Sequence, residues 1–160
     1  HGTGHIKAGG NYACSFFPGR DAKSQGYAEA LYLDPQEHKY IDEIGAANFL
    51  ALKKNTLLTP KSTSVLPSIT RRSLMRIASD LFQWPTEERK IALDELDEID
   101  AAACCGTAAV ITWIQEIHDS DRKWQFPFDE RWKKLYDKLV GIQTATEEDP
   151  FSWRYEIKLG

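Results

Sequence analysis

A lysine, two glycines and a tyrosine stand close together near the start of the chain, in the string Lys7-Ala8-Gly9-Gly10-Asn11-Tyr12. Glycines have no side chain, so they let the backbone approach a ligand closely. A lysine amine that has lost its proton can attack a carbonyl carbon, and a tyrosine hydroxyl can bind an anionic oxygen. Taken alone, however, the string favours a glycine-rich turn that leads a solvated lysine into a helix.

Three later segments also carry groups that can bind or react. Asp42 and Glu43 end a predicted strand, where alternation points their carboxylates to opposite faces. Ser68 is a good N-cap for a helix that begins at Ile69, and the free amides of a helix N-terminus favour phosphate. Gly106 precedes a predicted strand and can expose the amides that follow it. Each segment also has a plain structural reading, as a solvated strand-end acid, a capped helix or a turn.

Five strings, taken in order and with their spacing, resemble the branched-chain aminotransferases, which are pyridoxal-phosphate enzymes of fold type IV. They are KAGGNYA at 7–13, Tyr40 to Phe49 (YIDEIGAANF), Leu66 to Arg71 (LPSITR), Cys105 to Ile111 (CGTAAVI) and Leu135 to Gln143. The resemblance covers essentially all 160 residues and corresponds to the C-terminal large domain of that family. We therefore expect residues 1–160 to form one domain, as a piece of a longer protein whose N-terminal small domain is absent.

The resemblance implies how this chain would bind the ring of pyridoxal 5'-phosphate. Lys7 would bond to the cofactor's aldehyde, and after substrate displaces it, the same amine would carry a proton as general acid and base. Tyr12 would hydrogen-bond the phenolic oxygen of the ring. Glu43 would face the pyridine nitrogen and keep it protonated, which makes the cofactor an electron sink.

The resemblance also implies how the phosphate and the substrate would be bound. The backbone amides of Ile69 and Thr70 would hold the phosphate, with help from the Thr70 hydroxyl. Thr107 would add a second hydroxyl, and the amides of Thr107 and Ala108 would take the substrate carboxylate. Arg71 and Arg72 are interpreted as helix-face residues, because the family's phosphate-clamping arginine lies in the other domain.

The function implied is transamination between leucine, isoleucine or valine and 2-oxoglutarate, carried out by a homodimer. One alternative is a related fold-type IV enzyme, a D-amino acid aminotransferase or an aminodeoxychorismate lyase. Those relatives do not usually carry Gly-Gly-Asn-Tyr after the lysine. The other alternative is a non-catalytic domain derived from such an enzyme, which would have no use for this whole set of residues. The fragment alone is expected to be inactive.

The chain departs from the family pattern at several positions. Ala46 replaces a threonine that joins the family's phosphate network. The redox-active cysteine pair of animal enzymes is absent, because Ala109 and Thr112 occupy its positions. Trp113 stands where the family prefers proline, and Pro18 interrupts a helix that usually has none.

Composition narrows the class of protein further. The net charge of −4 and the scattered Lys and Arg residues give no electrostatic footprint for nucleic acid. The longest apolar runs are much shorter than the roughly 18–20 residues of a membrane span. An odd number of cysteines favours a reducing, cytoplasmic location. The four histidines, His1, His5, His38 and His118, have no zinc-ligand spacing, so we expect no metal.

Hydrophobic periodicity predicts a mixed α/β (α+β) domain, and the resemblance makes it a mixed β-sheet or pseudo-barrel flanked by helices, the D-amino acid aminotransferase-like fold. Helices are predicted over Tyr12–Gln25, from Ile69 onward, over Asp94–Ala103 and over Asp129–Thr144. Pro18 is expected to kink or shorten the first of them. Strands are predicted at Ala28–Asp34, Tyr40–Ile44, Asn48–Leu52, Thr56–Thr59 and Ala108–Ile114, the last covered on both sides, with a loop at Lys61–Ser68.

Overall fold

A mixed, seven-stranded sheet forms the centre of the molecule in the computed structural model, which describes residues 3–158. Its strands are β1 (Leu31–Leu33), β2 (Ile41–Ile44), β3 (Ala47–Lys53), β4 (Thr56–Pro60), β5 (Thr86–Arg89), β6 (Ala101–Gly106) and β7 (Val110–Ile114). All pairings are antiparallel except the one between β4 and β5. Strands β8 (Glu116–Asp119) and β9 (Arg122–Gln125) make a separate hairpin.

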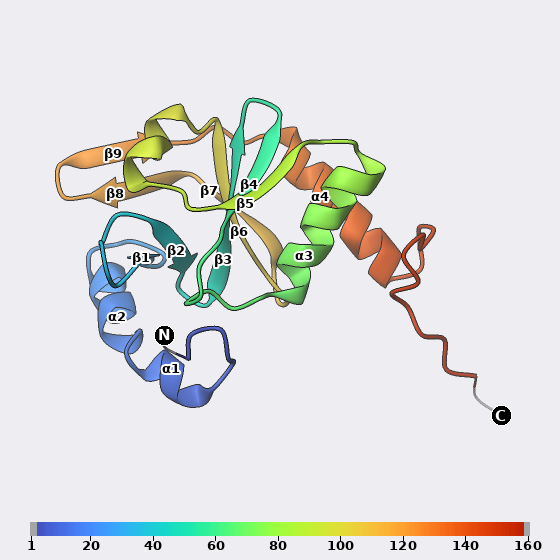
Figure 1. Ribbon diagram of the computed structural model, residues 1–160, viewed down its shortest axis with the longest axis horizontal. Helices are drawn as coiled ribbons and strands as arrows, with labels where there is room; N and C mark the ends of the chain where they lie inside the picture. Colours follow the sequence, from blue (N-terminus) through green and yellow to red (C-terminus); the bar gives the residue numbers. More distant parts are fainter. Residues whose placement is uncertain (1–2, 159–160) are drawn as a thin grey trace.

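The central strand β3 pairs with three others. Strand β6 runs along Asn48–Leu52, β2 pairs with its first two residues, and β4 pairs with its last three. Since a strand has two edges, β2 and β4 share one of them and diverge, as Figure 1 shows. The sheet therefore opens into two branches and is not a closed barrel, which corrects the pseudo-barrel expectation in that respect.

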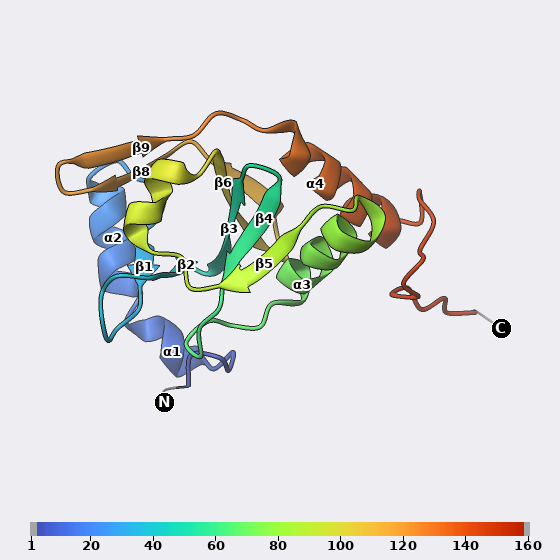
Figure 2. The same ribbon diagram turned by 45° about the horizontal axis from the view of Figure 1, so that its top comes forward.

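Helices cover the sheet unequally. Helices α3 (Ile69–Arg76) and α4 (Glu130–Gln143) lie side by side against one face (Figure 2). Short helices α1 (Gly9–Ala13) and α2 (Phe16–Ser24) lie beside β1 and β2 at the N-terminal end of the molecule. A π-helical turn, Ile77–Leu81, extends α3, and a 3-10 helix spans Leu93–Glu98.

Alternate residues of β3 enter two separate hydrophobic clusters, one on each face of the sheet. Leu50 and Leu52 pack with residues of α3 and α4, including Leu74 and Trp132. Phe49 and Ala51 pack with residues of the 3-10 helix and the hairpin on the other face, including Leu96, Ile117 and Trp124. This period of two explains why β3 reads as continuously apolar in the sequence.

Several predicted elements are confirmed at their predicted places. The turn at Lys54-Asn55, the Ser68 N-cap and the amphipathic last helix all appear, and the Ser68 hydroxyl oxygen accepts a hydrogen bond from the Arg71 amide at 3.2 Å. In α4 the side chains predicted to face inward, Trp132, Leu135, Leu139 and Ile142, are all buried.

The prediction of a helix over Asp94–Ala103 is wrong. The acidic part forms a 3-10 helix that ends at Glu98, and Ala101–Gly106 is the strand β6, paired with both β3 and β7. Alanine favours helices by itself, but the small side chains of Ala101, Ala102 and Ala103 are fully buried here. Tertiary packing on both faces of the sheet therefore overrides the local preference.

Two further expectations need correction. The first helix is divided at Cys14 and Ser15, and Pro18 sits in the first turn of α2, where its missing N–H leaves no hydrogen bond unmade. The strand predicted at Ala108–Ile114 begins at Val110, and Thr112 and Trp113 are exposed, so it is an edge strand covered on one side only.

Truncating Leu135 should test how far α4 stabilises the sheet. Leu135 is fully buried in the cluster formed by β3, α3 and α4. Leu135→Ala is expected to lower the free energy of unfolding by about 2–5 kcal/mol, because it leaves a cavity that the packed sheet cannot close. Urea titration followed by circular dichroism measures the loss. Tyr136→Ala, at an exposed position on the same helix, is the control and should change stability by less than about 1 kcal/mol.

Candidate functional site

The carboxylate of Glu43 is held from one side only. Its Oε1 atom accepts hydrogen bonds from the Asn48 side-chain amide and from the Leu66 backbone amide, both at 2.9 Å. Within residues 3–158 no group donates to Oε2. Burial raises the pKa of Glu43, and Asp42 adds to this, while the Leu66 hydrogen bond and the charge of Arg71 oppose it. The free oxygen is therefore able to accept a proton donor from a ligand.

Asp42 occupies a different environment from Glu43, although it is the adjacent residue. Its side chain is buried beside Ser62, with Asp34 and Lys90 as its charged neighbours. None of these groups contacts Glu43. Alternation along β2 thus separates the two carboxylates, and the sequence prediction that they point to different surroundings is consistent with these contacts.

The start of α3 presents free hydrogen-bond donors. Ser68 caps the amide of Arg71, and the Arg72 amide bonds to the Ser68 carbonyl. The amides of Ile69 and Thr70 have no acceptor in the described part of the chain, and the Thr70 hydroxyl makes no hydrogen bond there either. Two amides and a hydroxyl at a helix N-terminus match the needs of a phosphate group.

Thr107 and Ala108 lie in an exposed turn between two strands, not between a helix and a strand as the sequence suggested. Gly106 pairs with Val110 across this turn, and open space surrounds the position where a Gly106 side chain would stand. Val110 closes the turn with a φ of 61°, which a β-branched residue adopts only under strain. Figures 1 and 2 both show this turn beside the start of α3.

Lys7 lies in an exposed loop that Asn11 holds in shape. The Asn11 side-chain amide donates to the carbonyl oxygens of Thr3 and Ile6, both at 2.7 Å. Lys7 is the next residue after Ile6, and Tyr12, half-buried, follows in α1. The loop backbone is therefore fixed by side-chain contacts although the lysine itself is exposed.

The fold brings the N-terminal loop to the other predicted residues through the segment Lys61–Ser68. Gly4 packs so closely on Ser64 that an added Cβ would lie 2.3 Å from the Ser64 carbonyl oxygen. Leu66, two residues on, donates to Glu43, and Ser68 begins α3. In both ribbon views α1 lies next to this segment. The predicted residues thus surround one end of the sheet, although no direct contact joins Lys7 to Glu43.

The donors and acceptors at this end of the sheet fit a pyridoxal phosphate. The free Glu43 oxygen suits a protonated ring nitrogen, and the start of α3 suits the phosphate. Gly9 and Gly10 leave open space beside the Lys7 loop, since an added Cβ at either position would meet nothing within 4 Å. The chemistry of the group that the sequence implies therefore matches the chemistry of the free atoms.

Two residues at the site were not assigned a role from the sequence. Asn48 is 4% exposed and bonds to Glu43, and an amide inside the apolar run of β3 is the signal that marks it. Arg71, interpreted as a helix-face residue, is 5% exposed and forms an ion pair with Glu88 at 2.8 Å. Arg72 is exposed, in line with its interpretation.

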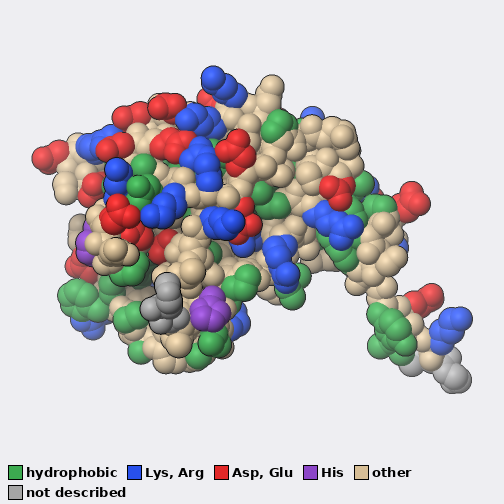
Figure 3. Space-filling view, viewed as in Figure 1, with side chains coloured by type: hydrophobic (Ala, Val, Ile, Leu, Met, Phe, Trp, Pro, Cys, Tyr) green, Lys and Arg blue, Asp and Glu red, His purple; other side chains and the backbone are tan. Residues whose placement is uncertain are grey.

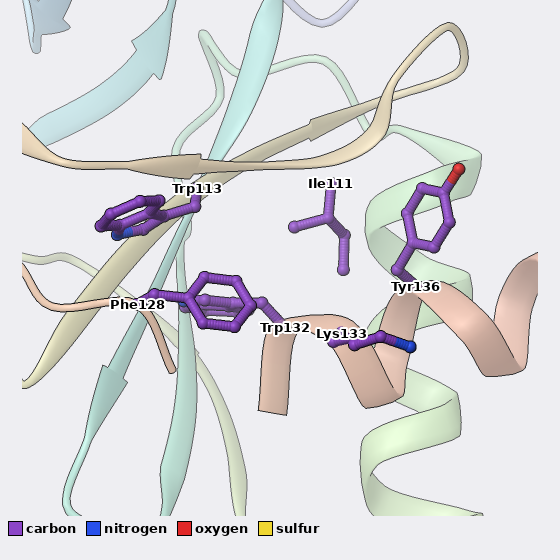
Figure 4. Close-up of a pocket in the computed structure, with 6 residues that line it drawn as sticks. All are labelled: Ile111, Trp113, Phe128, Trp132, Lys133 and Tyr136. Carbon is purple, nitrogen blue, oxygen red and sulfur yellow. The ribbon is translucent and has the colours of Figure 1, made fainter. Parts of the chain in front are cut away.

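Elsewhere on the molecule a shallow apolar groove lies between β7 and α4 (Figure 4). It holds about 180 Å³ and is lined by Ile111, Trp113, Phe128, Trp132, Lys133 and Tyr136. The rings of Trp113 and Phe128 meet edge to face, with centroids 5.6 Å apart. None of the predicted site residues lines this groove, so it is separate from the candidate site.

Within residues 3–158, no group of three His, Cys, Asp or Glu side chains is placed to hold a metal ion; His1 lies outside the described residues. Lys, Arg, Asp and Glu side chains are intermixed on the face shown in Figure 3, without a single-sign patch. None of the described helices is long and apolar enough to cross a bilayer.

Comparisons with known proteins point to one family. The profile of the family described as amino-transferase class IV matches residues 5–117. A branched-chain-amino-acid aminotransferase of Helicobacter pylori is 44% identical over 158 residues, which are 98% of this chain and 46% of that protein.

Solved structures agree with the sequence comparison. A branched-chain amino acid aminotransferase from Escherichia coli superposes with a TM-score of 0.82 at 30% identity, over 94% of this chain and 50% of that one. The enzyme of the same name from Thermobaculum terrenum, solved in its PLP form, gives 0.78 at 30% identity, over 89% and 46%. The chain spans about half the length of the relatives it matches.

Proposed function

The chain belongs to the class IV amino-transferase family, and from this premise we propose that it is the cofactor-binding, C-terminal part of a two-domain aminotransferase. The reaction proposed is pyridoxal-phosphate-dependent transfer of an amino group between leucine, isoleucine or valine and 2-oxoglutarate. The names of the relatives support this substrate class. Residues 1–160 would form one domain, with an N-terminal domain needed to complete the site.

One observation carries the proposal. Within residues 3–158, the carboxylate of Glu43 is fixed through Oε1 while Oε2 has no donor, at the same end of the sheet as the free amides of Ile69 and Thr70. An ordinary strand-end acid would not need two protein donors on one oxygen. A carboxylate and an anion cradle in one place are what a ring nitrogen and a phosphate require.

Each residue then has a defined task. Pyridoxal phosphate supplies a conjugated ring that can delocalise the electrons released when the substrate loses its α-proton. Glu43 would keep the ring nitrogen protonated, and the Tyr12 hydroxyl would donate a hydrogen bond to the ring's phenolic oxygen. Lys7 would hold the cofactor through Nζ, and the same nitrogen would carry the proton taken from the substrate α-carbon.

The anion-binding groups of the proposed site fix the position of both cofactor and substrate. The amides of Ile69 and Thr70 and the hydroxyls of Thr70 and Thr107 would hold the phosphate. The amides of Thr107 and Ala108 orient the substrate carboxylate. Because the turn that carries them is exposed in this chain, exclusion of water from the reacting atoms is assigned to the N-terminal domain.

The parent enzyme is further proposed to be a homodimer that is located in the cytoplasm. The three free cysteines suit a reducing compartment. Cys105 is buried, which raises the pKa of its thiol to about 12, so it does not supply a thiolate for redox chemistry at neutral pH.

The isolated chain is expected to bind pyridoxal phosphate weakly and to turn over no substrate. A missing charged partner for the phosphate costs about 1.5–3 kcal/mol, which lowers affinity about 10- to 150-fold. Titration of the chain with cofactor, read by visible absorbance, measures this. The Lys7→Ala chain serves as the control for reaction at other lysines. Tight binding by the isolated chain together with leucine transamination would contradict the expectation.

A direct assay of the full-length parent tests the proposed reaction. Purified parent, pyridoxal phosphate, 2-oxoglutarate and either leucine or D-alanine are combined, and glutamate formation is measured. Turnover with leucine supports the proposal. Turnover with D-alanine alone assigns the alternative within the same fold type, and bound cofactor without turnover of either substrate points to a non-catalytic domain.

A further inference from the structure

The side chain of Asn48 forms hydrogen bonds both with Glu43 and with the segment that leads into α3. Its side-chain nitrogen donates to Glu43 Oε1 at 2.9 Å and to the Leu66 carbonyl oxygen at 3.2 Å. The Leu66 amide closes the triangle with its own hydrogen bond to Glu43 Oε1, at 2.9 Å. The three residues therefore form a ring of three hydrogen bonds, and the side-chain amide of the buried Asn48 donates two of them.

The triangle joins parts of the chain that are distant in sequence. Glu43 and Asn48 are cross-strand partners on β2 and β3. Leu66 belongs to the segment that leads into α3, and the Ser68 amide bonds back to the Leu66 carbonyl at 2.8 Å. The same carbonyl thus receives bonds from Asn48 and from the cap residue of α3, so Asn48 connects the strand that carries Glu43 to the helix that offers Ile69 and Thr70.

Few side chains can make this connection. Aspartate at position 48 has the same shape but, when ionised, has no proton to donate, and its charge would repel Glu43. Leucine has the volume but no N–H group, so Glu43 Oε1 would lose one of its two donors and the Leu66 carbonyl would keep only the Ser68 amide. Alanine removes both bonds. The arrangement therefore depends on an amide of this length and not on filling space.

We propose that Asn48 is a positioning residue, which sets the Glu43 carboxylate and the phosphate-binding start of α3 at a fixed distance from each other. The inference rests on the proposed function, since it assumes that these two groups bind the two ends of one cofactor. Ring and phosphate are rigidly linked in that cofactor, so a protein that binds both must hold its own contacts at a matching spacing. Asn48 does not touch the cofactor itself.

The test compares four variants of the full-length parent loaded with pyridoxal phosphate that carries ¹⁵N in its ring. The ¹⁵N signal reads the ring nitrogen, and the ³¹P signal reads the phosphate. Glu43→Gln is expected to shift mainly the ¹⁵N signal, and Thr70→Ala mainly the ³¹P signal. Asn48→Ala is expected to shift both. Thr59→Val removes another buried hydrogen bond of the same sheet, from Thr59 to the Phe49 carbonyl, and is expected to shift neither.

A second measurement does not depend on the cofactor. In the cofactor-free parent, Asn48→Ala is expected to speed hydrogen exchange at the Leu66 amide about tenfold or more, the factor that loss of about 1.4 kcal/mol gives. Asn48→Ser, too short to bridge both partners, replaces the alanine variant if that variant does not fold, and the same results are expected of it.

These experiments distinguish failure of the role proposed for Asn48 from failure of the proposed function. Unchanged exchange at Leu66, a shift at one end of the cofactor only, or equal shifts from Thr59→Val would each overturn the proposal. If the unsubstituted parent binds no cofactor, the proposed function fails. The exchange experiment then decides by itself whether Asn48 couples Glu43 to the α3 segment.

Discussion

Replacing Lys7 with alanine in the full-length parent is expected to lower leucine transamination by at least about a thousandfold. The amine has two tasks in the proposed reaction, since it binds the cofactor and moves the substrate's α-proton. Proton transfer by a positioned side chain alone contributes about 10²–10⁴-fold. No other lysine stands in the short loop that Asn11 fixes, between Thr3 and α1, so none is placed to substitute for it.

The matched control for this experiment is Lys23→Ala. Lys23 is an exposed lysine on the neighbouring helix α2, with only a long, 3.8 Å contact to Glu29. Its replacement is expected to leave turnover within about twofold of the unsubstituted enzyme, because an exposed ion pair contributes little. Equal activities of the Lys7→Ala and Lys23→Ala enzymes would remove Lys7 from the mechanism and favour a non-catalytic domain.

Replacing Glu43 with glutamine is expected to lower turnover by about a hundredfold to a thousandfold without unfolding the protein. A preorganised charge at the reacting group contributes about this much in enzymes. The glutamine carbonyl oxygen can still accept the hydrogen bonds that Asn48 and Leu66 give to Oε1. At the Oε2 position an NH2 donor replaces the charged acceptor while the contacts at Oε1 remain, so the variant separates the chemistry of Oε2 from the structure that holds the side chain.

The pH dependence of the same group has a defined sign. Burial, helped by Asp42, raises the pKa of Glu43 above its ordinary value of 4.5. Because the ionised form is the one that holds the ring proton, activity is expected to fall as the pH drops through this raised pKa. The fall in kcat on the acid side of its pH profile measures this pKa. The residual activity of Glu43→Gln should show no such fall.

The stability of the fold is expected to change with pH in the opposite direction to the activity. A carboxyl whose pKa is raised in the folded state contributes stability at low pH that is lost as the pH rises through the folded pKa. At neutral pH the ionised Glu43 therefore destabilises the cofactor-free fold, and Glu43→Gln should keep or raise the Tm. A fall in Tm together with the fall in activity would indicate a structural role instead.

Asp42→Asn is the matched control for Glu43→Gln. Asp42 is the adjacent acid, it is buried, and its pKa is raised for the same main reason, burial. It lies among other neighbours, Ser62, Asp34 and Lys90, and is not expected to reach the cofactor. Its replacement should leave turnover within about tenfold. A larger loss from Asp42→Asn than from Glu43→Gln would exchange the roles assigned to the two acids.

The amino-acid sequence predicted those parts of the structure that depend on local order. The period of α4, the Ser68 cap and the Lys54-Asn55 turn were all found where predicted, because capping, turn chemistry and a single apolar stripe act between near neighbours. The mixed fold class likewise followed from hydrophobic periodicity, and the family from short strings of residues.

Where the local conformational preference of a segment disagrees with its tertiary packing, the prediction from the sequence was wrong. Ala101–Gly106 has the composition of a helix and forms a strand, because β3 and β7 pair with both of its edges. Arg71 follows a helical pattern toward the surface and is buried, because Glu88 on β5 provides a partner 17 residues away. In both cases the deciding contact comes from a distant segment.

The residues proposed for chemistry, beginning with Lys7, come from the sequence alone, through the five strings that resemble the family. Tertiary structure decided how they are held. Asn48 and Leu66 both donate to Oε1 of Glu43, and no group of residues 3–158 donates to Oε2; this arrangement requires strands β2 and β3 and the segment before α3 to meet. The physical reason is that a half-buried carboxylate and a buried amide must find hydrogen-bond partners, and only the folded chain brings those partners within 3.2 Å.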